Sequence, residues 1–332
     1  MTLPRLLVLS LGGTITMVRD SSGGIAPKLG AAELVASVPA LAEVARIEAR
    51  SPFRLPSPSI TMANMLEVAR ILNDAFSSTD PEASFDGAVV IQGTDTIEES
   101  AFFLDLLVAG DKPVIVTGAM RGAEAPGADG PANLLSAVRL AASPQARGLG
   151  ALVVLNYDIH AARFVQKSHT ALPSSFESPM IGPIGLVAEG RPRFFARVER
   201  RPCLPVPASP PPPIALLKIP MGFDGRLLSA LPGLGYAGLV IESMGAGHVP
   251  AEVAPMLGEI AARMPVVLAS RAMTGPVFTS TYGYPGGEID LISRGLIPSG
   301  ELSGLKARLL LGLCLGSGAD ASSVPLAFAP YQ

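Results

Sequence analysis

The sequence is poor in the residues from which several kinds of site are built. Its 332 residues include two cysteines, Cys203 and Cys314, which are far apart and outside any C-x-x-C motif. Neither a disulfide framework nor a cysteine metal site is therefore expected, and we interpret both thiols as inert. The three histidines, His160, His169 and His248, are not at metal-ligand spacing. We accordingly expect no metal and no cofactor.

Charged residues are also scarce, and neither sign dominates. Lys and Arg total 25 against 28 Asp and Glu, which gives a formal charge of −3 and a pI near 5.7. Because nucleic-acid binding needs a basic surface, it has little support, and a small molecule is the expected partner. No apolar run approaches the ~18 residues that a membrane-spanning helix needs, so we expect no membrane partner.

The first residues contain a short apolar stretch that admits two interpretations. Residues 6–11 follow Arg5 and could form the apolar region of a signal peptide. However, the stretch leads directly into Gly12 and Gly13 and lacks a small-x-small cleavage motif. It is more typical of a buried strand, and we expect a cytoplasmic protein.

What the chain does have is a large share of apolar residues, in short runs that alternate with helical patterns. Hydrophobic residues make up 48% and the mean hydropathy is +0.42, which predicts an outside apolar enough to favour oligomers. Unbroken apolar strands between helices are typical of parallel sheets covered on both faces. The predicted strands are residues 6–11, 87–92, 113–117, 151–156, 214–219, 237–242 and 265–270. The predicted helices are residues 31–37, 63–77, 97–109, 132–142 and 251–263.

A proline-rich segment divides the chain. Residues 200–213 carry seven prolines and can hold neither a helix nor a sheet ladder, so we interpret them as a stiff linker. We therefore predict two α/β domains with mainly parallel sheets. The larger N-terminal domain covers residues 1–199, and the smaller C-terminal domain covers residues 214–332.

Two predicted strands end in threonine-containing segments, at the edge where an open parallel sheet binds its ligands. Residues 12–14, Gly-Gly-Thr, follow the first strand, and glycines let a backbone turn sharply beside a ligand. Residues 93–96, Gly-Thr-Asp-Thr, follow the strand at 87–92 and lead into a helix.

The start of that helix has a second interpretation, because Thr96 with Glu99 fits a capping box and Asp95 with Glu98 resembles one. The two interpretations can coexist, since a helix N-terminus presents backbone N–H groups that would also stabilise an oxyanion. A G-x-G-x-x-G motif at 233–238 precedes a predicted strand instead of following one, so it does not indicate a dinucleotide site.

Five segments, in this order and at this spacing, resemble the bacterial-type L-asparaginases, also called asparaginase/glutaminases. They are Leu11-Gly12-Gly13-Thr14-Ile15, Gln92-Gly93-Thr94-Asp95-Thr96-Ile97-Glu98-Glu99-Ser100, Gly118-Ala119-Met120-Arg121, Ala128-Asp129-Gly130-Pro131-Ala132-Asn133-Leu134, and Arg163 through Lys167. A further match lies at residues 306–311, and the proline-rich segment falls where the family has its interdomain linker. The resemblance covers nearly the whole chain. It implies an amidohydrolase that splits a side-chain carboxamide into ammonia and a carboxylate.

The resemblance also implies a catalytic role for four residues. A carboxamide is a poor electrophile, so a covalent intermediate eases its hydrolysis. The family forms an acyl ester on a threonine at the position of Thr14, with a Thr–Asp–Lys group that matches Thr94, Asp95 and Lys167. Lysine in water is protonated near pH 7, so burial would have to lower the pKa of Lys167 before it could act as a base.

For substrate binding, the resemblance places the α-carboxylate on Ser57 and the α-ammonium on Asp95. The backbone N–H of Thr94 would belong to the oxyanion hole, and the carbonyl of Ala119 would accept from the carboxamide NH2. His248 lies in a loop that, in the family, reaches the neighbouring subunit's substrate. The resemblance therefore implies a homodimer or a dimer of dimers.

The sequence departs from the family pattern at three positions. Gly24 stands where the family has a lid tyrosine, Pro58 where it usually has a second polar substrate contact, and His248 where many members have asparagine. We expect L-asparagine to be hydrolysed faster than L-glutamine, with weaker binding than is usual in the family. Two alternatives remain open, a hydrolase of a different small amide and a catalytically silent binding protein on the same fold. A third alternative, a subunit of a tRNA-dependent amidotransferase, is less expected because the sequence begins directly at the first predicted strand, which leaves no room for an appended domain.

Overall fold

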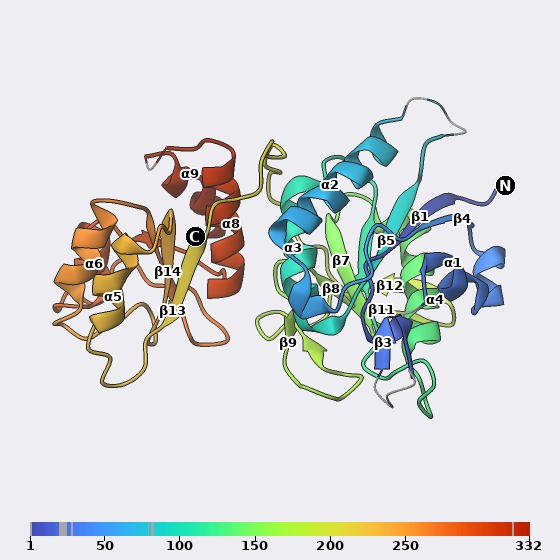
Figure 1. The fold of residues 1–332 in the computed structure, drawn as a ribbon, viewed down its shortest axis with the longest axis horizontal. Coiled ribbons are helices and arrows are strands. Elements are labelled where there is room, and N and C mark those ends of the chain that lie inside the picture. Colours follow the sequence, from blue (N-terminus) through green and yellow to red (C-terminus); the bar gives the residue numbers. More distant parts are fainter. Residues whose placement is uncertain (1, 20–24, 28, 79, 81–82, 321) are drawn as a thin grey trace. The chain divides into compact units, whose positions relative to one another are not determined.

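The computed structural model describes residues 2–19, 25–27, 29–78, 80, 83–320 and 322–332. The chain divides into two compact units, Met1–Cys203 (unit 1) and Leu204–Gln332 (unit 2) (Figure 1). The predicted domain limits at 199 and 214 stay a prediction. In the described part of the chain, we find no helix long and apolar enough to cross a membrane.

Unit 1 is built on an eight-stranded sheet with the order β12-β11-β8-β7-β6-β5-β1-β4. Its parallel part consists of β4 (Arg46–Arg50), β1 (Arg5–Ser10), β5 (Gly87–Ile91), β6 (Val114–Thr117) and β7 (Ala151–Leu155). Its antiparallel edge adds β8 (Asp158–Ala161), β11 (Gly185–Ala188) and β12 (Arg191–Phe194). The prediction of a mainly parallel sheet is thereby confirmed.

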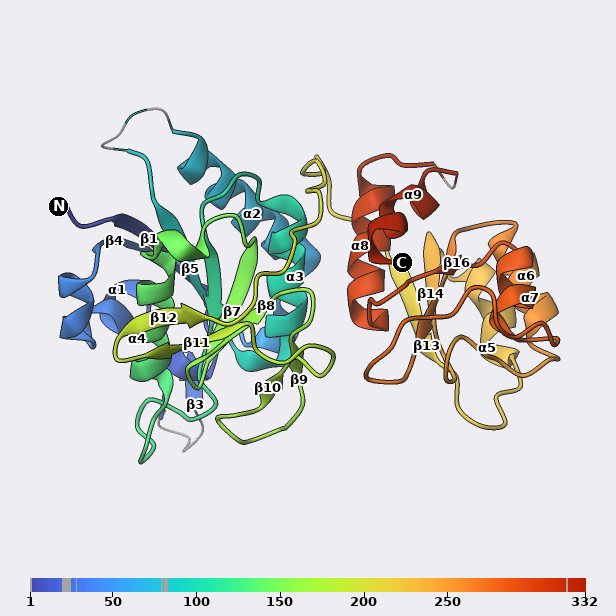
Figure 2. The ribbon, with the colours of Figure 1, turned by 180° about the vertical axis from the view of Figure 1, so that it is seen from behind.

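Helices cover both faces of this sheet, which explains why its central strands are apolar at nearly every position. Helices α2 (Met62–Ser77) and α3 (Ile97–Leu107) lie on one face, and α1 (Ala31–Ala36) and α4 (Gly130–Ala141) lie on the other (Figures 1 and 2). The β5 strand, for example, is buried along its whole length. Burial on both faces is the largest favourable term that holds these layers together.

Two short hairpins project from the layers of unit 1. One pairs β2 (Met17–Arg19) with β3 (Ile25–Pro27), directly after the turn at Thr14–Thr16. The other pairs β9 (Gln166–Lys167) with β10 (Phe176–Glu177) and carries Lys167.

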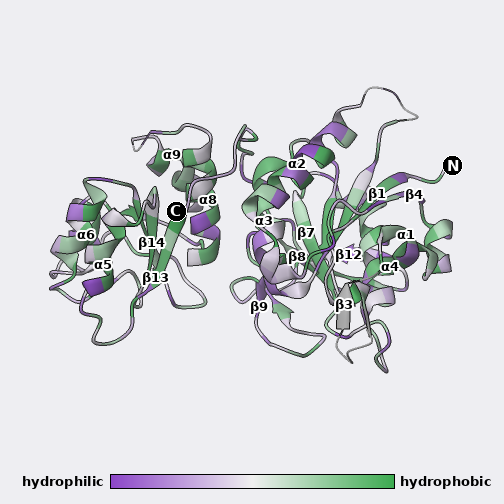
Figure 3. Cartoon of the chain, viewed as in Figure 1, coloured by the Kyte–Doolittle hydropathy of each residue, from purple (hydrophilic) through white to green (hydrophobic). Residues whose placement is uncertain are grey.

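Unit 2 repeats the layered plan on a smaller scale. Its sheet is parallel, with the order β13-β14-β15-β16. Figure 3 shows that the strands of both units are mostly hydrophobic. The strands are β13 (Ile214–Lys218), β14 (Gly238–Ser243), β15 (Val266–Ser270) and β16 (Ile297–Pro298). The helices are α5 (Arg226–Ala230), α6 (Ala254–Ala261), α7 (Glu288–Ser293), α8 (Gly304–Gly316) and α9 (Val324–Phe328).

Candidate active site

The candidate site lies at the carboxyl edge of three adjacent parallel strands of unit 1. In the register of β1, β5 and β6, Ser10 pairs with Ile91 and Ile91 pairs with Thr117. The segments that leave these strands therefore start side by side. They are the segments that carry Thr14 and Thr94 and the loop that follows Thr117.

Glycines bring the first two segments into direct contact. Gly12 and Gly13 both have positive φ, +112° and +93°, a region that other residues rarely adopt. A Cβ on Gly13 would overlap the backbone of Gly93. Each of these two packed glycines is followed by a threonine, Thr14 or Thr94, so the two segments that carry the predicted threonines lie against each other. The catalytic roles of the two threonines stay a prediction.

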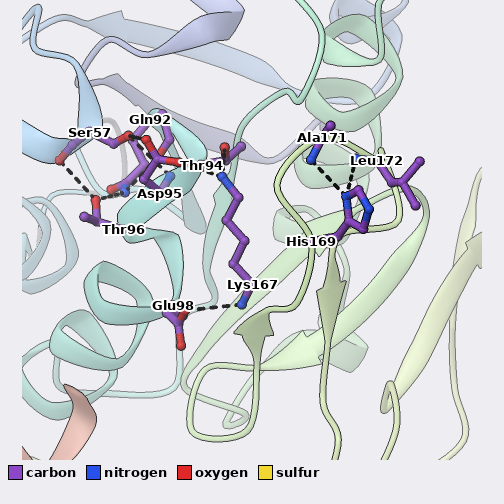
Figure 4. Close-up of polar contacts among 11 residues, drawn as sticks. Ser57, Gln92, Thr94, Asp95, Thr96, Glu98, Lys167, His169, Ala171 and Leu172 are labelled. Carbon is purple, nitrogen blue, oxygen red and sulfur yellow. Dashed lines mark hydrogen bonds and ion pairs between the residues drawn. The ribbon is translucent and has the colours of Figure 1, made fainter. Parts of the chain in front are cut away.

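Lys167 links the second threonine to a carboxylate (Figure 4). Its Nζ donates to Thr94 Oγ1 at 2.9 Å and forms an ion pair with Asp95 Oδ1 at 2.6 Å. Thr94 is buried, and the Lys167 side chain is 15% exposed, whereas the Asp95 side chain is 59% exposed. The hydrogen bond from Lys167 holds the pKa of Asp95 below its usual value, against the opposing effect of partial burial. Asp95 is therefore a carboxylate at neutral pH.

Ser57 packs against the same carboxylate. It is buried, and its Oγ lies 3.3 Å both from Asp95 Oδ2, to which it donates, and from Asp95 N, from which it accepts. A Cβ on Gly93 would lie 2.7 Å from this Oγ, so the approach of Ser57 depends on the glycine. Pro58 and Ser59 are exposed. The predicted substrate ligands Ser57 and Asp95 thus share one end of the site.

Ala119 follows β6 in a loop that two side chains of the α4 segment hold in place. The carboxylate of Asp129 accepts from the backbone N–H groups of the two residues that follow Ala119, at 3.0 and 2.9 Å. Asn133 donates to the carbonyl of Gly118 at 3.0 Å. Ala119 itself is buried, and these contacts hold the backbone on both sides of it. Asp129 and Asn133 lie in a segment that matched the family, although the sequence assigned them no role.

Two other predicted positions belong elsewhere in the chain. Gly24, the position of the lid tyrosine, lies outside the described residues. His248 belongs to unit 2, where its Nε2 lies 3.4 Å from Glu288 Oε2 and its ring meets Tyr282 and Tyr284 edge-on, at 4.8 and 5.5 Å between centroids. Its role as a substrate ligand stays a prediction.

Sequence reasoning missed the partner of His248, the fully buried Glu288. Its Oε1 accepts from the backbone N–H groups of Thr281 and Tyr282, at 2.8 and 2.6 Å. A buried carboxylate held by backbone donors is well defined in space but leaves little trace in a sequence. The one available signal was an isolated glutamate after two glycines.

The capping box predicted for Thr96 with Glu99 is wrong. Thr96 is the residue that precedes the helix, yet its side chain makes no capping hydrogen bond. Its Oγ1 accepts from Gln92 Nε2 at 3.1 Å and donates to the carbonyl of Ser57 at 3.4 Å. Glu98 Oε1 accepts from the backbone N–H of Lys167 at 3.2 Å. Thr96 and Glu98 thus bond to residues 39 and 69 positions away in the sequence.

Three further titratable side chains are partly or fully buried, namely His160, Cys203 and Cys314. Burial lowers the pKa of His160 to about 4 and raises the pKa of Cys314 to about 11, and it also raises the pKa of Cys203. Both cysteines are therefore thiols at neutral pH, the unreactive form. Among the described residues, no cluster of three or more His, Cys, Asp or Glu side chains is suited to hold a metal ion.

The chain is similar to known proteins over nearly its whole length. Residues 5–200 match the family described as asparaginase, N-terminal, and residues 213–328 match the glutaminase/asparaginase C-terminal domain. The chain belongs to the asparaginase family. It is therefore an amidohydrolase that acts on linear amides, as the sequence predicted.

Several proteins named as asparaginases align with nearly the whole length of this chain. A protein named probable L-asparaginase from Deinococcus radiodurans is 38% identical and covers 98% of both chains. A probable periplasmic L-asparaginase from Haemophilus influenzae is 33% identical and covers 94% of this chain and 89% of its own length. A crystal structure of a probable cytoplasmic L-asparaginase from Campylobacter jejuni superposes with a TM-score of 0.87 at 30% identity, covering 98% of this chain and 99% of that one. The fold predicted from the sequence is that of the asparaginase family.

Proposed function

We propose that this enzyme hydrolyses L-asparagine to L-aspartate and ammonia through an acyl ester on Thr14. The observation that carries the proposal is the 2.9 Å hydrogen bond from Lys167 Nζ to Thr94 Oγ1, joined to Asp95, in a segment that packs against the one that carries Thr14. A hydroxyl, an amine and a carboxylate in series are what a threonine nucleophile needs for proton transfer. The names of the relatives support L-asparagine as the substrate.

The proposed reaction has two steps. The Thr14 hydroxyl oxygen attacks the carboxamide carbon, the C–N bond breaks, and the hydroxyl proton leaves with the amine as ammonia. Water then attacks the ester carbon and the ester C–O bond breaks; one proton of the water returns to the Thr14 oxygen, and the other leaves as the product ionises to a carboxylate and is taken up by ammonia to form ammonium. Lys167 and Thr94 relay the protons, and the backbone N–H of Thr94 stabilises the oxyanion in both steps.

The α-amino-acid end of the substrate is proposed to bind at Ser57 and Asp95. The two bonds that join these residues are long, at 3.3 Å, and the Asp95 side chain is 59% exposed, so a substrate can replace them. Asp95 is ionised and can pair with an α-ammonium. We propose that L-asparagine is preferred over L-glutamine, and that Pro58 in place of a polar contact weakens binding.

Ammonia release from a panel of amides tests this function. We expect kcat/KM to be highest for L-asparagine, lower for L-glutamine and D-asparagine, and lower still for succinamate, which lacks the α-ammonium. Thr14→Ala should release no ammonia above background, whereas the wild-type protein quenched during turnover should carry an aspartyl ester that mass spectrometry places on Thr14. An inactive wild-type protein that binds amino acids would identify a silent binding protein, and activity on another amide alone would identify a different hydrolase.

We further propose a homodimer or a dimer of dimers, in which the partner's loop around His248 completes each site, and a cytoplasmic location. The aromatic and acidic side chains around His248 support the first point, because they already hold this loop in a defined conformation. Sedimentation of an active monomer at assay concentration would contradict the shared site. Fractionation of cells that express the native gene, with detection in the periplasm or medium, would contradict the location.

A further inference from the structure

The strand β9, which carries Lys167, is bonded to β10 along one edge and to the side chain of Glu98 along the other. Lys167 belongs to β9, a strand of two residues, where it faces Phe176 of β10 in an antiparallel pair. The following residue, Ser168, donates its N–H back into the hairpin, to the carbonyl of Ser175 at 2.7 Å. The N–H of Lys167 instead donates to Glu98 Oε1 at 3.2 Å. Glu98 thus serves as a bonding partner on the edge of β9 that β10 does not occupy.

The same stretch of chain holds Lys167 at both ends (Figure 4). Thr94 and Asp95, in the turn before α3, bind its Nζ, and Glu98, in the first turn of α3, binds its backbone. A carboxylate in the first turn of a helix is also stabilised by the helix dipole. The turn before α3 and the first turn of α3 therefore hold both the backbone N–H and the Nζ of Lys167, whose side chain is otherwise highly flexible.

We propose that Glu98 is a positioning residue for the proton relay, acting through the backbone of Lys167 and not on the substrate. The proposal rests on the proposed function, since it assigns Lys167 a part in the reaction. A two-residue strand is bound weakly by its own ladder, so loss of the Glu98 contact frees Lys167 to shift. A shift of about 1 Å in a reacting group can cost on the order of a hundredfold in rate.

Two substitutions separate the hydrogen bond from the charge. Glu98→Ala removes the acceptor, and we expect kcat to fall about 10- to 100-fold with KM changed less than about threefold. Glu98→Gln keeps an Oε1 acceptor at the same place, and it should retain kcat within about threefold. Glu177→Ala is the matched control, because it removes an exposed carboxylate from the same hairpin and should leave kcat unchanged.

Amide hydrogen exchange at Lys167 tests the contact without reference to activity. We expect the Lys167 N–H to exchange about 5- to 10-fold faster in Glu98→Ala and at the wild-type rate in Glu98→Gln. Unchanged exchange or unchanged kcat in Glu98→Ala would overturn the proposal, as would equal losses in both variants, which would assign the effect to charge. Wild-type protein that releases no ammonia would instead overturn the proposed function, while the exchange rates would still decide the contact.

Discussion

Units 1 and 2 share a layered α/β plan and differ in how one hydroxyl beyond a strand end is bonded. In unit 1, Thr117 Oγ1 at the end of β6 donates to the carbonyl of Val154 at 2.7 Å, whereas Thr94 Oγ1, in the turn that follows β5, accepts from the side chain of Lys167. In unit 2, the serines that end two strands are bonded to backbone, with Ser243 Oγ donating to the Ala269 carbonyl at 2.6 Å and Ser270 Oγ donating to the Gly245 carbonyl at 2.5 Å. A strand-end hydroxyl becomes available for chemistry where its partner is a titratable side chain, and it serves the fold where its partner is a carbonyl.

The lysines of the two units extend this comparison. Lys218 ends β13 and pairs with Glu242 at 3.3 Å, but its side chain is 64% exposed. Lys167 pairs with Asp95 at 2.6 Å, is 15% exposed and also binds a hydroxyl. An ion pair in solvent contributes little, whereas an enclosed amine bonded to a hydroxyl can transfer a proton.

The largest expected effect comes from replacing the Lys167 amine or the Thr14 hydroxyl with an apolar group. Lys167→Met and Thr14→Val should each lower kcat by roughly a thousandfold or more, because relay and nucleophile act as a unit. Lys218→Met, the matched control in unit 2, should leave kcat within about twofold. Steady-state ammonia release checks all three. A Lys167→Met enzyme with near-normal turnover would remove this lysine from the mechanism and end the contrast between the two units.

Glycines offer a second test of the contrast. Gly13 in unit 1 and Gly275 in unit 2 have nearly the same φ, +93° and +91°, but a Cβ on Gly275 would have no neighbour within 4 Å. Gly275→Ala should lower the free energy of unfolding by about 1–2 kcal/mol, the cost of positive φ alone. Gly13→Ala should lower it by about 1–3 kcal/mol more, through overlap with Gly93, and should lower kcat about a hundredfold by moving Thr14. Urea unfolding and kcat measured on both variants check this; equal losses would show that the contact with Gly93 is unimportant.

The sequence was sufficient for the parts of the molecule that rest on local patterns. Buried parallel strands such as β5 and β7 are short apolar runs bounded by turns, and the predicted limits agree with the observed ones within one residue. The candidate site residues Thr14, Thr94 and Lys167 could be proposed from the sequence because they lie in recognisable segments. The contact of Lys167 with Thr94, 73 residues apart in the sequence, could be anticipated only through the family resemblance.

Features that depend on tertiary context were missed for physical reasons. Helix α8 is buried on nearly every side, with Leu309, Leu310, Leu311 and Leu313 all enclosed, so it has no polar face to reveal a helical period. The contact of Glu98 with Lys167 was not predicted, because the pattern of Asp95 with Glu98 only resembles a capping box and carries no sign of a partner 69 residues away. Such choices are decided by packing between distant segments, which composition and periodicity do not record.

A smaller effect is expected where unit 2 is proposed to contribute binding but no chemistry. His248→Ala should raise KM for L-asparagine about tenfold with kcat nearly unchanged, because a lost hydrogen bond to a charged group costs about 1.5–3 kcal/mol. His248→Asn keeps a hydrogen-bonding side chain and should stay within about threefold of the wild-type KM. Equal KM values for wild type and His248→Ala, measured where the protein is an oligomer, would exclude the loop from the site.

The smallest effect concerns the acid stability of unit 1. The pKa of Asp95 is lowered in the folded chain, chiefly by the Lys167 hydrogen bond, so the contribution of this ion pair to stability is complete well above the ordinary value of 3.8 and is lost as the pH falls through 3.8 toward the lowered pKa. Because the Asp95 side chain is 59% exposed, the contribution should be less than about 1 kcal/mol.

Carboxyl carbon NMR, with the Asp95 signal assigned by its absence in Asp95→Asn, measures this titration directly. We expect a midpoint below 3.8 in the wild-type protein and a return toward 3.8 in Lys167→Met, since the variant removes the donor that holds the carboxylate ionised. Asp95→Asn should in turn lose the part of the acid sensitivity that appears below pH 4 in urea unfolding. A midpoint that does not move in Lys167→Met would mean that the lysine does not control this carboxylate, and the distinction between the two lysines would then rest on the hydroxyl of Thr94 alone.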